Sequence, residues 1–123
     1  MKKRVLIVDD SPLIHSLLRK TLLKYGYEVC GDAKNGREGV EMFRQLMPDT
    51  VFMDINMPVM DGLEAVKNIK QICEELNVKA RIIMLSAIGD DEVTVKARNL
   101  GVFIFLKKPF DDYTIISAMS MTE

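Results

Sequence analysis

The chain has 123 residues, a length that suits one domain with a hydrophobic core of its own. Apolar residues make up 48% of it, which argues against disorder, and a formal net charge of −1 lacks the basic excess of nucleic-acid-binding domains. No apolar run approaches the length of a membrane span. Cys30 and Cys73 form neither a CxxC motif nor a zinc spacing, so we expect small buried or half-buried apolar residues in a reducing cytoplasm.

Five short apolar segments predict buried strands, and a segment with helical periodicity follows each of them. The predicted strands cover residues 4–8, 27–31, 50–54, 81–85 and 102–106. The predicted helices begin near Ser11-Pro12, Asn35-Gly36, Asp61-Gly62, Asp90-Asp91-Glu92 and Asp111. This alternation implies parallel crossover connections, so we expect an α/β fold with a five-stranded, doubly wound parallel sheet covered by helices on both faces.

Three positions within the predicted helices bear on packing. Gly39 costs roughly 1 kcal/mol relative to Ala inside a helix, so we expect close packing to require it. Tyr25 and Leu76 continue the apolar faces of the first and third helices, and we place both on the inner side.

His15 lies one position away from the apolar face of the first helix. A histidine there could accept a phosphoryl group or act as a pH switch. No acid or cysteine lies near it in the sequence, so we interpret it as a partly exposed helix residue without a chemical role.

Polar side chains with chemical potential follow four of the predicted strands. Asp9-Asp10 follows the first, Asp54 ends the third, Ser86 follows the fourth, and Lys107-Lys108-Pro109 follows the fifth. The carboxyl ends of parallel strands share one edge of a sheet, and ligands bind at that edge. We therefore expect acids, a hydroxyl and an amine to converge there.

Three carboxylates in one cleft repel each other, and a hard divalent cation relieves that repulsion. Mg²⁺ prefers oxygen ligands and commonly uses one or two carboxylates together with water and phosphate oxygens. We predict a Mg²⁺ site with Asp10 and Asp54 as direct ligands, Asp9 acting through water, and the backbone carbonyl of Asn56 as a further ligand.

An aspartate at such an edge can act as a nucleophile and form an acyl phosphate. Phosphoryl transfer depends mainly on positioning and on neutralising charge. In this reading Asp54 accepts the phosphoryl group, the Lys108 ammonium faces one phosphoryl oxygen, and the Ser86 hydroxyl donates a hydrogen bond to another.

Together, Asp9-Asp10, Asp54 in VFMDINMPVMDG, Ser86-Ala87 and Lys108-Pro109-Phe110 resemble the receiver domain of two-component response regulators. The resemblance covers essentially the whole chain, so residues 1–123 are expected to form a single receiver domain. It implies a flavodoxin-like three-layer sandwich with strand order 2-1-3-4-5. It also implies that Asp54 takes its phosphoryl group from a sensor histidine kinase, and that Lys108, rather than Lys107, is the family's lysine, followed by a cis bond to Pro109.

The resemblance further implies a conformational switch. Ser86 moves toward the phosphoryl group and Phe105 turns inward, which alters the face formed by the fourth helix, the fifth strand and the fifth helix. A downstream protein reads this face, and Val95, Lys96 and Asn99 are our candidate contact residues. Ile88 lies where the family tunes dephosphorylation, and its apolar side chain predicts slow loss of the phosphoryl group.

The protein is thus expected to be a signalling switch rather than a turnover enzyme. Asp54-Ile55-Asn56 resembles the DxD of haloacid dehalogenase-type phosphohydrolases, but Asn56 cannot supply their general acid-base. A module that binds without being phosphorylated and a flavin-binding protein are further alternatives, and Asp9-Asp10 would repel a flavin phosphate. The chain is expected to be either a free-standing receiver or a fragment of a longer regulator, and the Met start and polar finish favour the former. We expect a monomer, either of the chemotaxis type or of the phosphorelay type; the sequence names neither its kinase nor its output.

Overall fold

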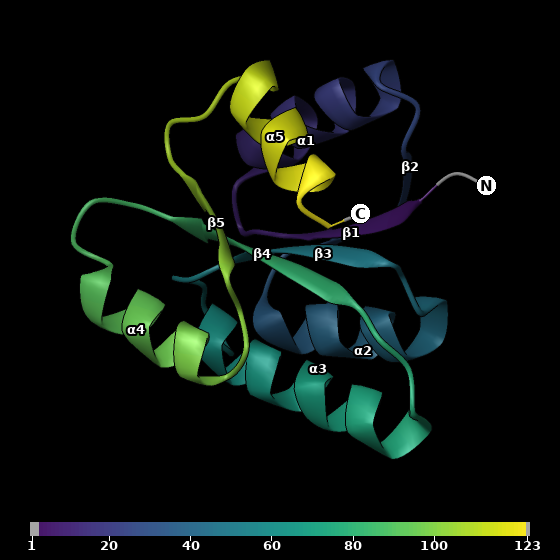
Figure 1. The fold of residues 1–123 in the computed structure, drawn as a ribbon, viewed down its shortest axis with the longest axis vertical. Helices are drawn as coiled ribbons and strands as arrows, with labels where there is room; N and C mark the ends of the chain where they lie inside the picture. Colours follow the sequence, from purple (N-terminus) through teal and green to yellow (C-terminus); the bar gives the residue numbers. More distant parts are fainter. Residues whose placement is uncertain (1–2, 123) are drawn as a thin grey trace.

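The computed structural model describes residues 3–122, and strands and helices alternate along them (Figure 1). The strands are β1 (Arg4–Val8), β2 (Glu28–Ala33), β3 (Thr50–Asp54), β4 (Arg81–Ser86) and β5 (Ile104–Lys107). The helices are α1 (Pro12–Lys24), α2 (Gly36–Leu46), α3 (Gly62–Leu76), α4 (Asp91–Asn99) and α5 (Asp112–Ser120). Met1 and Glu123, the two ends on which the expectation of a free-standing chain depends, lie outside the described residues.

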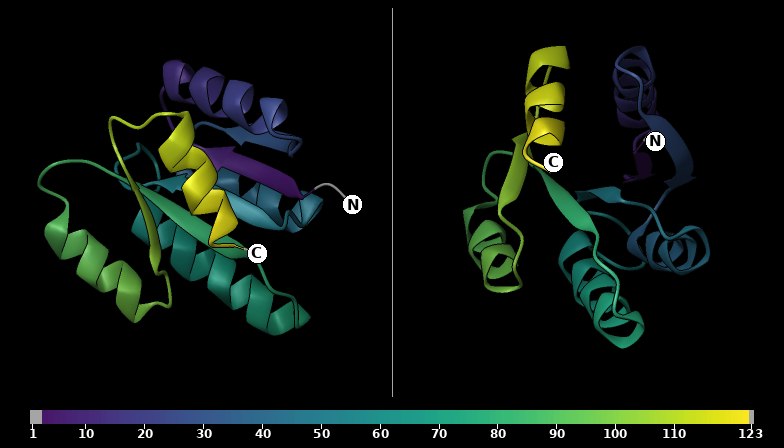
Figure 2. Two further views of the ribbon diagram at one scale, coloured as in Figure 1. Left: turned by 45° about the horizontal axis from the view of Figure 1, so that its top comes forward. Right: turned by 45° about the vertical axis from the view of Figure 1, so that its right-hand side comes forward.

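The five strands form one parallel sheet with the order β2-β1-β3-β4-β5. Helices α1 and α5 cover one face of this sheet, and α2, α3 and α4 cover the other (Figures 1 and 2). The predicted three-layer α/β fold and its strand order are therefore confirmed.

The core is divided by the sheet into two layers, because successive side chains of a strand point to opposite faces. In β1, Val5 and Ile7 pack with Leu18 and Leu22 of α1, whereas Leu6 and Val8 belong to the layer beneath α2 and α3. All of these side chains are fully buried. Burial on both faces explains why the strand sequences are almost continuously apolar.

Gly39 of α2 is required by the packing of this helix against β1. A Cβ atom at position 39 would lie 2.9 Å from both γ-carbons of Val8, closer than carbon atoms approach without displacement. The predicted close contact at Gly39 is confirmed.

Several predicted boundaries need correction. β2 occupies residues 28–33 rather than 27–31, and Ser86 is the last residue of β4. β5 begins at Ile104 rather than at Val102, because the Val102 N–H donates to the Ala97 carbonyl and completes the turn after α4. Phe103 is left 71% exposed as a result.

The placement of Tyr25 and Leu76 on inner helix faces is wrong. The two side chains are 50% and 49% exposed, respectively. Tyr25 is the residue at which α1 ends, and Leu76 is the last residue of α3. The last fully buried side chains of these helices are Leu22 and Ile72, so the apolar periodicity continues for one more turn than the buried face does.

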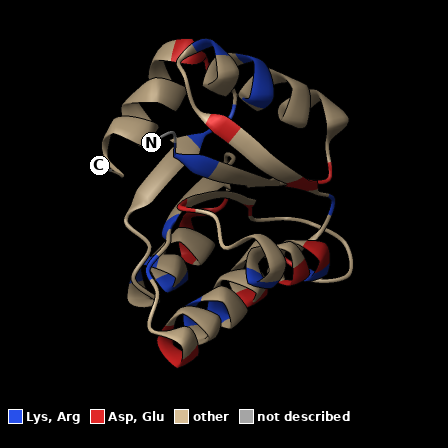
Figure 3. Ribbon diagram, turned by 90° about the vertical axis from the view of Figure 1, so that its right-hand side faces the viewer, with Lys and Arg blue, Asp and Glu red and all other residues tan. Residues whose placement is uncertain are grey.

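The surface carries both signs of charge. Figure 3 shows Lys and Arg interspersed with Asp and Glu over the helices, in keeping with the net charge of −1. None of the helices within residues 3–122 combines the length and apolar character needed to cross a bilayer.

Candidate functional site

The pairing of β1 with β3 brings two acids to the same edge of the sheet. Val8 pairs with Met53, so Asp9 and Asp54 follow directly at the carboxyl ends of neighbouring strands. Both acids are buried, Asp9 completely. Asp10, one residue further along, is exposed.

The pairing of β4 with β5 adds a hydroxyl and an amine at that edge. Asp54 pairs with Leu85, and the next residue of β4, Ser86, pairs with Lys107 of β5. The backbone N–H of Lys108 donates to the Ser86 carbonyl at 2.7 Å, which extends the ladder by one residue. The predicted convergence of these side chains is therefore observed, and it follows from the strand register.

Asp9, Asp10 and Asp54 form a compact group of carboxylates. One oxygen of each lies within 4.8 Å of the others. Asp9 Oδ1 accepts the Ser11 N–H at 2.8 Å, whereas Asp9 Oδ2 is buried and faces the Lys108 ammonium at 3.2 Å. Hard oxygen ligands at this spacing fit a small divalent cation.

Lys108 is the cation that faces these acids. Its ammonium donates to Asp54 Oδ1 at 3.1 Å and lies 3.2 Å from Asp9 Oδ2. The Lys108–Pro109 peptide bond is cis. Lys107 is exposed, so the two adjacent lysines occupy different environments.

The surroundings make Asp54 a weaker acid than usual. Burial, followed by the negative charges of Asp9 and Asp10, raises its pKa from 3.8 to about 6, although Lys108 opposes the shift. The pKa of Lys108 is also raised: burial lowers it, but the hydrogen bond and charge of Asp54, with those of Asp9, outweigh that effect. The charge of Lys108 thus favours the ionised form of Asp54, and the charge of Asp54 favours the protonated form of Lys108.

The backbone after β3 is held close to the strand end. The Gly62 N–H donates to the Ile55 carbonyl at 2.8 Å, and a Cβ atom at position 62 would overlap the Asp54 carbonyl oxygen. Asn56 is exposed, and its amide donates to Asp90 Oδ1 at 3.4 Å, which links this loop to the loop before α4. The ligand role of the Asn56 carbonyl stays a prediction.

The residues of the predicted switch lie on β4, β5 and α4. Ser86 is buried at the end of β4, and Phe105 of β5 is half-buried, with the Arg98 guanidinium of α4 5.3 Å from its ring centre. Val95, Lys96 and Asn99 are exposed on α4. Ile88 is 92% exposed in the loop after β4.

Sequence reasoning missed the partners of His15. Its Nδ1 lies 2.8 Å from Asp32 Oδ1, and its Nε2 lies 2.6 Å from the Asp9 carbonyl oxygen and 3.1 Å from that of Ala33. Arg19, one turn further along α1, also pairs with Asp32. The predicted partial exposure of His15 is confirmed, since its side chain is half-buried. The expectation that no acid lies near it is wrong, because the parallel pairing of β1 with β2 brings Asp32 beside α1.

Comparison with known proteins agrees with this geometry. The family of response regulator receiver domains matches residues 5–120. The chain is 42% identical over 120 residues to the chemotaxis protein CheY of Thermotoga maritima, covering 98% of this chain and 97% of that protein. It is 41% identical over 122 residues to CheY of Bacillus subtilis, covering 99% and 98%.

Solved structures give the same result. CheY of Borrelia burgdorferi, in a complex with CheX, BeF3 and Mg²⁺, superposes with a TM-score of 0.88 at 30% identity, over 97% of this chain and 87% of that one. CheY4 of Vibrio cholerae superposes with a TM-score of 0.89 at 31% identity, over the whole of both chains.

The chain belongs to the response regulator receiver domain family. It is a phosphoacceptor domain of two-component signalling, and thus a signalling switch. Among characterised members it is similar to CheY, the chemotaxis response regulator.

Proposed function

We propose that Asp54 is the residue that accepts the phosphoryl group, from the phosphohistidine of a sensor histidine kinase. The observation that carries this assignment is the position of Asp54 at the end of the central β3. There it is flanked by Asp9 and Asp10 and hydrogen-bonded to the Lys108 ammonium at 3.1 Å. Asp10 is exposed and Asp9 is fully buried, so Asp54 is the acid that combines a fixed position with access to a donor.

Mg²⁺ is the cofactor that this acid cluster best accommodates. Asp10 and Asp54 would bind it directly, Asp9 would act through water, and the Asn56 carbonyl would complete the protein's share of the ligands. The spacing of the three carboxylates supports this arrangement, because one oxygen of each lies within 4.8 Å of the others and the single Lys108 ammonium is the only cation paired with Asp9 and Asp54 among the described residues. The bound cation would neutralise charge on the transferring group.

In the transfer, an Asp54 carboxylate oxygen attacks phosphorus as the bond from phosphorus to the donor's imidazole nitrogen breaks. The electron pair of that bond returns to the nitrogen, which then takes up a proton. Lys108 and Ser86 face the phosphoryl oxygens, the first with its ammonium and the second with its hydroxyl. With Mg²⁺ bound, the chain's own groups thus carry out self-catalysed phosphorylation once a donor is bound.

The phosphoryl group then competes with Asp54 and Asp9 for the Lys108 ammonium and attracts the Ser86 hydroxyl. Movement of Ser86 opens space into which Phe105 turns from its position beside Arg98. This changes the face of α4, β5 and α5, on which Val95, Lys96 and Asn99 are exposed, and a downstream protein binds it. The exposed, apolar Ile88 orients no water, so dephosphorylation is slow.

The proposal also covers the domain organisation, the oligomeric state and the cellular location of the protein. Residues 1–123 act as one receiver domain, monomeric and in the cytoplasm, where a histidine kinase reaches it. The similarity to CheY supports an output through protein contact, and no nucleic acid or membrane takes part.

Intact-mass measurement after incubation with acetyl phosphate and Mg²⁺ tests the central assignment. We expect one phosphoryl group per chain, lost in alkali and absent after EDTA treatment. The Asp54→Asn variant should remain unmodified.

Two outcomes would contradict the proposal. A phosphoryl group on the Asp54→Asn variant would assign acceptance to another residue. Continuous release of inorganic phosphate over many turnovers would instead support a phosphohydrolase.

A further inference from the structure

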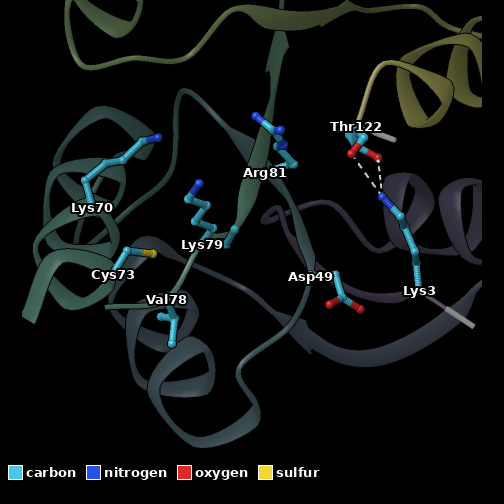
Figure 4. A pocket seen from close by; sticks show the side chains of 9 residues that line it. Lys3, Asp49, Lys70, Cys73, Val78, Lys79, Arg81 and Thr122 are labelled. Atoms are coloured by element: carbon cyan, nitrogen blue, oxygen red, sulfur yellow. Dashed lines mark hydrogen bonds between the residues drawn. The ribbon is translucent and has the colours of Figure 1, made fainter. Parts of the chain in front are cut away.

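A basic hollow lies at the opposite edge of the sheet from Asp54. It has a volume of about 600 Å³ and opens beside the amino-terminal ends of the central strands, where Lys3 precedes β1, Asp49 precedes β3 and Arg81 begins β4 (Figure 4). Its size falls in the range of small-molecule sites. The acceptor site does not use this edge.

Positive charge predominates in the hollow. Lys3, Lys70, Lys79 and Arg81 line it, and Asp49 is the only acid among its described lining residues. Figure 4 shows the ammonium groups of Lys70 and Lys79 and the guanidinium of Arg81 directed toward the space between them.

The charges of these basic groups are largely uncompensated. Lys70, Lys79 and Arg81 form no ion pair with any carboxylate of residues 3–122. Asp49 is occupied, since its Oδ2 accepts the Arg4 backbone N–H at 2.8 Å. A multivalent anion could pair with Lys70, Lys79 and Arg81 at the same time.

An aromatic surface lies next to the basic groups. A second hollow, of about 280 Å³, shares Lys70 and Arg81 with the first and is lined further along by Phe103 and Met121. These two side chains are 71% and 65% exposed. An exposed ring beside a cation cluster offers a stacking surface to a planar group attached to the anion.

We propose that this edge binds a nucleotide carrying two or more phosphates. The phosphates lie among Lys70, Lys79 and Arg81, and the base lies against Phe103. Lys3 bounds the far side, where its ammonium donates to the Thr122 carbonyl at 3.0 Å and so holds the end of the chain against the start of β1. The Cys73 thiol, which also lines the hollow, stays uncharged at neutral pH because burial raises its pKa.

Isothermal titration calorimetry of the purified chain with ATP, tripolyphosphate and adenosine tests the proposal. Protein and ligand solutions are freed of divalent cations on a chelating resin, so that no cation bridges a phosphate to the acids around Asp54 and no chelating anion competes for the hollow. We expect ATP to bind more tightly than tripolyphosphate, and adenosine not to bind detectably. Added salt should weaken ATP binding.

Variants locate the site. Lys70→Gln combined with Arg81→Gln should weaken ATP binding by about tenfold or more, because two charge-assisted contacts are removed. The matched control, Lys67→Gln with Arg44→Gln, removes the same charge from exposed positions outside the hollow and should have little effect. Phe103→Ala should weaken ATP binding while leaving tripolyphosphate binding unchanged.

Several results would overturn the proposal. These are no ATP binding by the unaltered chain at millimolar concentration, an equal loss in the control pair, and ATP binding no tighter than that of tripolyphosphate. Binding of an acidic peptide, with no binding of ATP, would also overturn the proposal. The Asp54→Asn variant should bind ATP as the unaltered chain does, so this test succeeds or fails independently of the acceptor assignment.

Discussion

Lys108 Nζ and Asp54 Oδ1 lie 3.1 Å apart at the carboxyl edge of the sheet, and the same ammonium lies 3.2 Å from Asp9 Oδ2. One cation therefore offsets two carboxylates, both of which are almost completely buried. In the unphosphorylated protein, Lys108 offsets the charge of these two buried carboxylates. It therefore contributes to the stability of the fold as well as to phosphoryl transfer.

Replacing Lys108 with Ala should therefore destabilise the protein at pH 7. We expect a loss of about 2–3 kcal/mol in the free energy of unfolding, less than for a fully buried pair because the Lys108 side chain is 26% exposed. Lys107→Ala is the control, since its side chain points to solvent. Urea denaturation of both variants measures the difference, and equal stabilities would show that Lys108 is not a counter-charge.

The stability should also depend on the protonation of Asp54. Its pKa is about 6 in the folded protein and 3.8 ordinarily, so the folded state binds the proton more tightly than the unfolded state. In EDTA, stability should then fall as the pH rises from about 4 through 6, by the order of 1–2 kcal/mol after allowance for solvent at the open edge.

Asp54→Asn removes this contribution. The variant should match the unaltered protein near pH 4 and exceed its stability at pH 7. Thermal unfolding across this range measures the difference between the two proteins, and parallel curves would argue against a raised pKa.

Mg²⁺ should stabilise the protein through the acid cluster. Binding to the folded state alone adds about 1.4 kcal/mol when the Mg²⁺ concentration is ten times its dissociation constant. Asp10→Asn should abolish most of this gain without harming the fold, because Asp10 is exposed. Asp91→Asn, another exposed acid, should leave the gain intact, and an equal effect of both substitutions would point to non-specific screening.

Ser86 should couple phosphorylation to the α4–β5–α5 face. In Ser86→Ala, acetyl phosphate should still modify Asp54, but the response of α4 and β5 should be much reduced because the hydroxyl that follows the phosphoryl group is gone. NMR chemical shifts of Phe105, Val95, Lys96 and Asn99, with and without acetyl phosphate, report the response. Shift changes as large as those of the unaltered protein would exclude Ser86 from the switch.

Helix propensity alone would make Gly39→Ala stabilising, but the contact between α2 and β1 predicts the opposite effect. Gly39→Ala should destabilise the protein by about 1–3 kcal/mol, because the added methyl group would meet Val8 at 2.9 Å. Glu41→Ala, at an exposed position of the same helix, should change stability by less than about 0.5 kcal/mol. A more stable Gly39→Ala variant would show that β1 and α2 can move apart.

The fold was predictable because strand and helix periods alternate clearly and the reactive side chains follow strands. Asp54 could be placed at the edge of the sheet because a buried run stops there and Pro58 follows shortly after. Strand order was not readable from composition; the resemblance to receiver domains supplied it.

Contacts that depend on strand pairing were not predictable. His15 and Asp32 are 17 residues apart, and they meet because β2 lies beside β1 in parallel register. Arg19 was the available signal, since it lies one helical turn from His15 and could face the same acid. The exposure of Phe103 was likewise hidden, because its apolar neighbours continue a strand pattern that the turn after α4 interrupts.

Identification of the phosphorylated residue tests the account most directly. Borohydride reduces an acyl phosphate to an alcohol and thus converts a phosphorylated aspartate to homoserine, which peptide mass spectrometry can locate. After treatment with acetyl phosphate and Mg²⁺, we predict homoserine at position 54 alone. Homoserine at position 9 or 10, or a stable phosphoryl group on His15, would contradict the assignment of Asp54.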